Sequence, residues 1–412
     1  MPKTILMIAF DFPPSNAASV QRTLKFFEYL NELGWTTIIL TAKTNAYSLI
    51  DNNFEVKLKP NQFVYRATAL DVHKHLSIKG KHFNWMKTPD RWGSWIPFAI
   101  QLGKKVINKH QPDIIWSTFP TPSANLIANK LAKYSKKPWV ADYRDPAPYI
   151  HTTNGKWLDK VHKKIDDITF KQAKHICFAT LASKNLYQSQ YPQHSNFSVI
   201  ENGFDEANFT IAEQLSTTHD NIFNSQKFSL YYAGGLYPHG RDPVPIFEAI
   251  AALMQQGLIT AENFELIFQG AGDGAEFSAI LQKLKLENVI TFIQPTSFLL
   301  ALVNMTRANA LLLIQDARFN LQIPGKIFEY FRTGKPLLIK TDPQGATAEL
   351  AKTYQYSHLA NSNTELQSAL TKLISPSATV STNVDISCHD RKFKANKLNE
   401  LLSNIINKNH SF

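Results

Sequence analysis

Lys326 and Glu329 lie three residues apart in the segment IPGKIFEYFRTGKP, which spans residues 323–336. Pro324 suits the first turn of a helix, where its missing N–H leaves no hydrogen bond unmade. Lys326 would then lie near the helix N-terminus, where a bound anion is favoured. Apolar neighbours predict a largely buried helix, and a buried Glu329 carboxylate needs polar partners such as sugar hydroxyls. A weak surface ion pair between the two side chains is the alternative interpretation.

Two glycine-containing segments each follow a predicted strand and precede a predicted helix. In YYAGGLYPHGRDP (231–243), Gly234 and Gly235 permit close backbone approach to a ligand, and Arg241 could neutralise a phosphate. In QGAGDGAEF (269–277), Gly272 lies at the centre of a loop that either approaches a ligand or only makes a tight turn. Neither segment matches the G-x-G-x-x-G or the Walker A pattern.

The segment FDFPPSNAASVQR (10–22) joins the first predicted strand to a helix. The small residues Ala18 and Ser19 would let the backbone approach a phosphate at the helix N-terminus, and Ser19 could cap that helix. Arg22 lies one turn into the helix and could reach the same ligand. An ordinary strand-to-helix turn explains this segment equally well.

The segment ADYRDP (141–146) places charged residues directly after a predicted strand. Either Arg144 or Asp145 faces a substrate there, or the two side chains satisfy each other as an ion pair.

Alternating strands and helices predict two α/β domains with parallel sheets. Ligands bind open sheets of this kind at the carboxyl ends of the strands. The predicted domains are residues 1–190 and 200–385, joined near 185–225, and residues 386–412 form a C-terminal helix that could pack on either domain. The predicted strands are 4–10, 35–41, 113–119, 138–143 and 175–180 in the first domain, and 228–235, 264–270, 288–294, 310–315 and 336–341 in the second.

The chain of 412 residues carries 44 Lys and Arg against 33 Asp and Glu, a net charge of +11. Residues 1–190 hold 27 of these cations but only 13 of the carboxylates. Such a distribution indicates either a solvated basic face or a surface that meets an anionic partner, of which a membrane or a phosphorylated acceptor fits best. No nucleic-acid-binding module is recognisable, so nucleic acid is not expected as a partner.

The irregular segment 44–98 carries Trp85, Trp92, Trp95 and several cations. It is predicted to be an insertion with loops that line a cleft, contact a membrane or cover the core as a hydrophobic lid. Two cysteines are too few for a disulfide framework, and no apolar run reaches membrane-spanning length. We therefore expect a cytoplasmic protein, with peripheral attachment to the inner face of the cell membrane as a further option.

Six segments, in order, resemble the glycosyltransferase family 4 group, most closely bacterial members that build surface polysaccharides. The resemblance implies an α/β GT-B fold with two Rossmann-like domains, and retaining transfer of a sugar from a UDP- or GDP-sugar without a metal or other cofactor. It also implies an acceptor bound by the N-terminal domain, and the excess of cations in residues 1–190 makes a lipid-linked or oligosaccharide acceptor the expectation. The six segments are FPPSNAASVQRTLKFFEYL, STFPTPSANLIANKLAK, KPWVADYRDP, VIENGFD, AGGLYPHGRDP and PGKIFEYFRTGKP.

By position in these motifs, Glu329 corresponds to the glutamate that binds the donor ribose, and Lys326 and Arg241 to cations on the diphosphate. The predicted donor-binding set is Ala18, Ser19, Arg22, Gly234, Gly235, Arg241, Gly272, Lys326, Ile327 and Glu329. The predicted catalytic set is Asp145, Arg144 and Lys326.

The sequence departs from the family pattern at positions that contact the donor. The first glutamate of the E-x7-E pair is replaced by Leu321, with Asn320 and Gln322 beside it, and Gly235 stands where an arginine is usual. The first loop also lacks the usual glycines. These departures leave two alternatives open, a non-catalytic partner subunit of a polysaccharide assembly complex and a nucleotide-sugar 2-epimerase.

Overall fold

The computed structural model describes residues 2–410 except 52, 53, 55, 78, 80, 152–154, 237–239 and 376–384. The chain divides into two compact units, which are described separately. Unit 1 comprises Met1–Asn202 together with Arg391–Phe412, and unit 2 comprises Gly203–Asp390.

Unit 1 is built on a seven-stranded sheet in the order β3-β2-β1-β4-β5-β6-β7, and every neighbouring pair is parallel. Its central strands are almost wholly apolar because helices cover both faces. The strands are β1 (Thr4–Ile8), β2 (Thr36–Ala42), β3 (Gln62–Ala67), β4 (Ile114–Phe119), β5 (Trp139–Tyr143), β6 (His175–Phe178) and β7 (Phe197–Val199).

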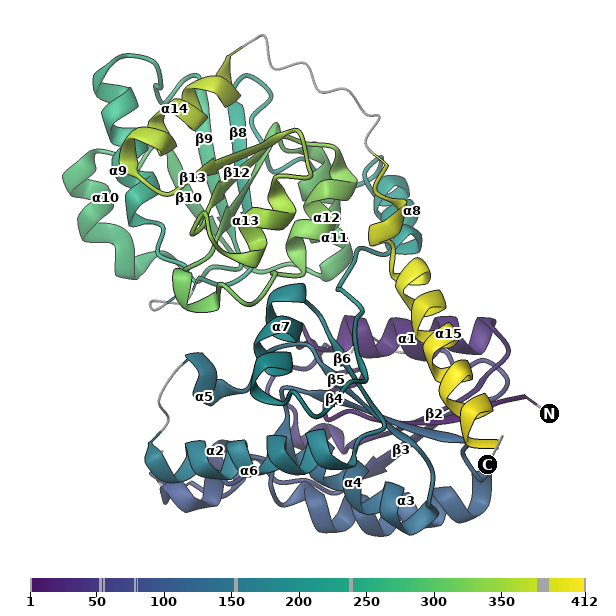
Figure 1. Cartoon of the computed structure of the whole chain (residues 1–412). Coiled ribbons are helices and arrows are strands. Elements are labelled where there is room, and N and C mark those ends of the chain that lie inside the picture. Colours follow the sequence, from purple (N-terminus) through teal and green to yellow (C-terminus); the bar gives the residue numbers. More distant parts are fainter. Residues whose placement is uncertain are drawn as a thin grey trace. The chain divides into compact units, whose positions relative to one another are not determined.

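The helices of unit 1 form two layers, one on each face of the sheet (Figure 1). Helices α3, α4, α6 and α7 contribute to one core, while α1 and α15 pack side by side on the other face. The C-terminal helix therefore belongs to unit 1. The helices are α1 (Val20–Glu32), α2 (Val72–His75), α3 (Trp95–His110), α4 (Pro122–Ser135), α5 (Pro148–His151), α6 (Lys156–Gln172), α7 (Leu181–Gln190) and α15 (Arg391–His410), with 3-10 turns at Thr44–Ala46 and Asn84–Lys87.

The segment 44–98 corrects one expectation, because it contributes a strand as well as loops. It contains β3, which pairs with β2 at the edge of the sheet. The strand reads QFVYRA and only its first and last residues are buried. An edge strand keeps polar side chains in contact with solvent, so it lacks the continuous apolar run by which the central strands were predicted.

Unit 2 repeats the architecture with six parallel strands in the order β10-β9-β8-β11-β12-β13. Residues alternate between two cores along each strand, so that Tyr232 faces one core and Tyr231 the other. The strands are β8 (Phe228–Ala233), β9 (Phe264–Gln269), β10 (Ile290–Ile293), β11 (Ala310–Ile314), β12 (Leu337–Lys340) and β13 (Ser357–Ala360).

The helices of unit 2 also cover both faces. Helices α9, α10 and α14 contribute to one core, and α8, α11, α12 and α13 to the other. The helices are α8 (Glu206–Leu215), α9 (Val244–Gln255), α10 (Ser278–Leu284), α11 (Phe298–Arg307), α12 (Lys326–Thr333), α13 (Ala346–Ala351) and α14 (Asn363–Ile374), with 3-10 turns at Ala275–Phe277, Ala317–Phe319 and Ser387–His389. Within the described part of the chain, no helix is both long enough and apolar enough to cross a bilayer.

Candidate functional site

The centre of the candidate site in unit 2 is the short helix α12, whose N-terminus lies beside the end of β8. Gly325 precedes the helix, and Gly334 ends it with a positive φ of 71°, a conformation that favours glycine. Ile327 and Phe328 are buried in one core of unit 2. This packing fixes the helix, so that the polar residues on its remaining face have defined positions.

Lys326 is held against the carboxyl end of β8. Its Nζ donates a hydrogen bond of 2.5 Å to the carbonyl of Ala233 and lies 4.0 Å from the ring centroid of Tyr232. Desolvation and the nearby Arg241 lower the pKa of Lys326 well below its usual value, while Glu329 acts in the opposite direction. The residue as a whole stays partly exposed. An anion bound at this ammonium would relieve the unfavourable environment.

The turn after β8 brings the backbone close to this ammonium. Gly234 has a φ of 102°, and a Cβ at this position would lie 3.5 Å from Nζ of Lys326. The carbonyl of Gly235 accepts hydrogen bonds from Nη1 of Arg241 at 3.0 Å and from the hydroxyl of Tyr232 at 2.9 Å. The structure thus brings together four residues predicted from the sequence, Gly234, Gly235, Arg241 and Lys326, and adds Tyr232 and the carbonyl of Ala233. Residues 237–239 of the same predicted turn lie outside the described residues.

Glu329 lies one turn along α12 and is only 7% exposed. Its carboxylate is close enough to Lys326 to raise the pKa of that lysine. Ile327, also in the predicted set, is fully buried and contributes packing.

The second glycine turn adjoins the first. A Cβ at Gly270 would lie 3.9 Å from the Cα of Gly234, and Gly270 and Gly272 both have positive φ values. A Cβ at Gly272 would meet no atom within 4 Å, so this position is open. Its role in donor binding stays a prediction.

The residues at the missing glutamate of the E-x7-E pair form a local network. The side-chain amide of Asn320 donates to Asp342 at 2.7 Å, and its backbone carbonyl accepts from the N–H of Ala346 at 2.8 Å. The carbonyl of Gln322 accepts from the hydroxyl of Thr347 at 3.1 Å. These bonds tie the segment before α12 to the carboxyl end of β12, where α13 begins.

In unit 1, the loop after β1 is closed by Asp11, which the sequence interpretation did not single out. The carboxylate accepts hydrogen bonds from the hydroxyls of Ser15 at 2.9 Å and Ser19 at 2.8 Å. Ser19 does occupy the position before α1, but its side chain makes no capping bond. An acid that follows a strand and precedes two serines within eight residues is the signal that could have revealed this loop. Ala18 lies in the same loop.

The side chain of Arg22 makes hydrogen bonds to other residues of unit 1. It makes a bidentate ion pair with Asp142 of β5, at 2.9 Å through Nε and 2.7 Å through Nη2, and both residues are buried. It also donates to the carbonyls of Ile200 and Glu201, at 2.7 and 2.9 Å. These bonds join α1 to the segment that leaves β7. The predicted contact of Arg22 with a donor phosphate stays a prediction.

Arg144 and Asp145 follow β5 at the carboxyl edge of the sheet of unit 1. Nε of Arg144 donates to the carbonyl of Phe119 at 3.2 Å, while its Nη2 lies 3.9 Å from the Asp145 carboxylate. The ion pair is therefore loose, and both side chains keep partial exposure. Among the described residues, no group of three or more His, Cys, Asp or Glu side chains could hold a metal ion.

Comparisons with known proteins give matches in structure but none in sequence. No family model matches the chain, and none of the curated proteins compared matches its sequence. Sucrose-phosphate synthase from Thermosynechococcus elongatus is 14% identical, over 98% of this chain and 100% of that one, with a TM-score of 0.69. HepE from Anabaena, solved in complex with UDP, is 16% identical, over 97% and 100%, with a TM-score of 0.64.

The α,α-trehalose 6-phosphate synthase from Burkholderia multivorans is 11% identical, over 100% of this chain and 98% of that one, with a TM-score of 0.69. Each of these structures aligns over nearly its full length, and the present chain has two parallel sheets of seven and six strands covered by helices. The chain therefore has the two-domain α/β architecture of glycosyltransferases known as the GT-B fold.

Proposed function

We propose that this protein is a retaining glycosyltransferase that moves a sugar from a UDP- or GDP-sugar to a lipid-linked or oligosaccharide acceptor. The observation that carries the proposal is the arrangement at the end of β8, where Lys326, Arg241 and two glycines surround one stretch of backbone. Two neighbouring cations beside glycines, where no side chain blocks approach, suit a diphosphate.

The cations would act chiefly on the leaving group. In sugar transfer, negative charge grows on the nucleoside diphosphate as the glycosidic bond breaks, so fixed cations there stabilise the transition state more than the ground state. Lys326 and Arg241 take this role, and Glu329 accepts hydrogen bonds from the ribose hydroxyls. Asp145 and Arg144 of unit 1 act on the acceptor and the transferred sugar.

The comparisons support the donor class. HepE was solved with UDP, with UDP and glucose, and with UDP-glucose. Two further neighbours are named as synthases of sugar phosphates, one of them explicitly UDP-forming. Retention of configuration, membership of glycosyltransferase family 4 and a role in capsule or lipopolysaccharide synthesis rest on the sequence resemblance. Peripheral attachment to the cytoplasmic face of the cell membrane rests on the excess of cations in residues 1–190.

A non-catalytic partner subunit is the second candidate. Leu321 replaces the glutamate that contacts the transferred sugar in the resembled family, and Asn320 beside it is bonded to Asp342. Such a subunit would keep the fold without turnover.

An assay of nucleotide release by the purified chain tests the proposal. UDP- and GDP-sugars are supplied with and without a total lipid extract that contains glycolipid acceptors. Release that requires the extract, with transfer of label to lipid, is the expected result. Conversion of the donor without an acceptor would indicate a 2-epimerase, and the absence of any turnover with every donor would favour the partner subunit.

A further inference from the structure

A stretch of unit 1 is rich in cations and aromatic residues and has no carboxylate. The sequence from His73 to Lys87 reads HKHLSIKGKHFNWMK, with four lysines, three histidines and no Asp or Glu. Two of its aromatic side chains are far more exposed than is usual, Phe83 at 72% and Trp85 at 66%, and Leu76 is 37% exposed. Single exposed apolar residues need no explanation, but large ones clustered in one segment do.

This stretch is folded back on itself beside a second exposed segment. The rings of His73 and His82 lie 4.6 Å apart, which joins the first residue of the stretch to its second half. Nζ of Lys74 donates to the carbonyl of Asn45 at 3.1 Å, which joins the stretch to the loop after β2. That loop continues into Leu49 and Ile50, which are also exposed.

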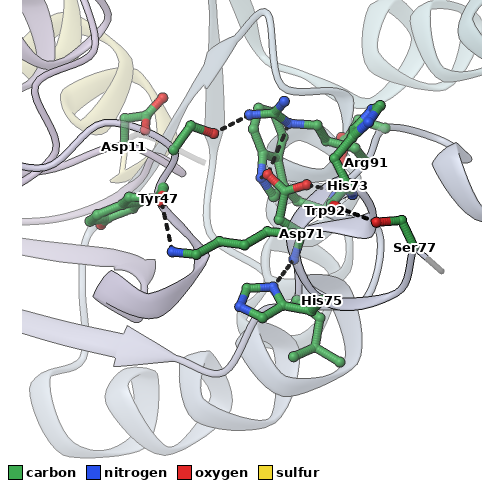
Figure 2. A network of polar contacts seen from close by, with 12 residues as sticks. Asp11, Tyr47, Asp71, His73, His75, Ser77, Arg91 and Trp92 are labelled. Atoms are coloured by element: carbon green, nitrogen blue, oxygen red, sulfur yellow. Dashed lines mark hydrogen bonds and ion pairs between the residues drawn. The ribbon is translucent and has the colours of Figure 1, made fainter. Parts of the chain in front are cut away.

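The base of this surface is a buried polar network (Figure 2). Asp71 accepts hydrogen bonds from the backbone N–H of His73 at 2.8 Å and from Nε1 of Trp92 at 3.1 Å, and it forms an ion pair with Arg91 at 3.2 Å. The backbone N–H of Asp71 donates to Nδ1 of His75 at 2.9 Å. These bonds fix the turn that carries Lys74 and Leu76, and Lys74 itself is turned toward the loop after β2.

We propose that the basic aromatic surface formed by Leu76, Lys79, Lys81, Phe83 and Trp85 docks this protein on an anionic lipid bilayer. The proposal deepens the peripheral attachment proposed above by assigning it to one surface. Aromatic side chains partition into the headgroup region, and lysines beside them bind anionic lipid. The surface follows β2 and β3, so it lies at the carboxyl edge of the sheet of unit 1, where an acceptor would bind.

Sedimentation with vesicles tests the assignment. The full chain is mixed with vesicles of phosphatidylcholine alone or with 30 mol% (roughly a typical anionic content) phosphatidylglycerol at low and physiological salt. Two variants change the surface: Phe83→Ser with Trp85→Ser, and Lys79→Gln with Lys81→Gln. A matched control changes Tyr134→Ser, Lys109→Gln and Lys133→Gln. These residues lie near the C-terminal ends of α3 and α4, which precede β4 and β5, so they are at the opposite edge of the same sheet.

The wild-type protein and the control are expected to sediment with anionic vesicles only. The lysine variant is expected to bind about 30-fold more weakly at low salt, at roughly 1 kcal/mol per lysine, and the aromatic variant about 10-fold more weakly. The proposal is overturned if the wild-type protein does not sediment, or if both surface variants sediment like it. A nucleotide-induced thermal shift retained by the variants shows that they are folded, and it separates failure of this surface from failure of the proposed transferase activity.

Discussion

Among single residues, Lys326 contributes most directly to the proposed nucleotide site. Burial and Arg241 lower the pKa of its ammonium, whereas a bound diphosphate would raise it. Binding of a nucleoside diphosphate above the lowered pKa should therefore take up a proton, and affinity should fall as pH rises. Lys326 is also expected to stabilise the leaving group.

The corresponding prediction compares two lysines of the same segment. Lys326→Met should lower turnover about 10-fold or more and abolish proton uptake on UDP or GDP binding, measured by calorimetry in buffers of different ionisation enthalpy. Lys335→Met is the matched control, because burial also lowers the pKa of Lys335 but it follows the C-terminal end of α12. Equal proton uptake by wild type and Lys326→Met would contradict the assignment.

Gly234 gives a second prediction at this scale. Its φ of 102° strains any other residue, and a Cβ would lie 3.5 Å from Nζ of Lys326. Gly234→Ala should therefore destabilise unit 2 by about 1–2 kcal/mol and weaken nucleotide binding. Gly257→Ala, at a φ of 72° with no atom within 4 Å of the added Cβ, should lower stability alone. Isothermal titration calorimetry with UDP or GDP measures the nucleotide affinity of both variants. Unaltered nucleotide affinity in Gly234→Ala would count against the proposed site.

At the scale of elements, a buried tyrosine cluster fixes the segment that follows Arg144 and Asp145. The carboxylate of Asp166 in α6 accepts hydrogen bonds from the hydroxyls of Tyr143 and Tyr149, both at 2.8 Å, and of Tyr187 at 3.3 Å. The hydroxyl of Tyr187 in turn accepts from the N–H of Ala147 at 2.9 Å. Helix α6 thereby holds both ends of the short segment that leads into α5.

Asp166 makes this element sensitive to pH. Desolvation raises the pKa of its carboxyl from 3.8 to about 6, despite the three tyrosine hydroxyls that lower it. An acid with a raised pKa in the folded state stabilises the fold most at pH values below its unfolded pKa. That contribution is lost as the pH rises from about 4 through about 6, by roughly 3 kcal/mol.

The test is the free energy of unfolding of wild type minus that of Asp166→Asn, measured by denaturant titration from pH 4 to 7.5. We expect the difference to decrease across this range. Asp167→Asn is the matched control, because hydrogen bonds from Lys163 and Tyr191 outweigh desolvation and lower the pKa of this exposed neighbour. Its difference should stay nearly constant across this range, because a lowered pKa places the titration of Asp167 below about pH 4. A difference for Asp166→Asn that is independent of pH would show that the carboxyl does not titrate in this window.

Apolar runs in the sequence predicted ten of the thirteen described strands, and β3, β7 and β13 were missed. The apolar runs of β1, β4 and β11 and the flanking Pro324 and Gly334 of α12 are strong local signals. The edge strand β3 has no such run, since solvent covers part of it. In the site, Lys326, Arg241 and the two glycines were predicted because they belong to recognisable sequence motifs. Tyr232 was not, because its contact with Lys326 joins segments that only folding brings together. Asp11 was overlooked, although Ser15 and Ser19 follow it within eight residues.

At the scale of the whole molecule, two units of the same architecture carry different chemistry. Unit 2 presents cations and glycines at the end of β8, whereas unit 1 presents the Asp11 loop, Arg144 and Asp145, and the basic aromatic surface. The excess of cations in residues 1–190 belongs to unit 1. This division matches an enzyme in which one unit binds a nucleotide donor and the other binds an acceptor at an anionic surface.

The most direct test of the central claim is a thermal-shift panel of UDP, GDP, ADP and CMP, with UDP- and GDP-sugars, on the wild-type chain and on Lys326→Met. A ligand that binds only the folded state raises the midpoint of unfolding. We predict a clear rise with UDP or GDP and its sugar, lost in Lys326→Met and kept in Lys335→Met. No shift of the wild-type protein with any nucleotide, or an equal shift in Lys326→Met, would contradict the account that α12 and the turn after β8 form a nucleotide-sugar site.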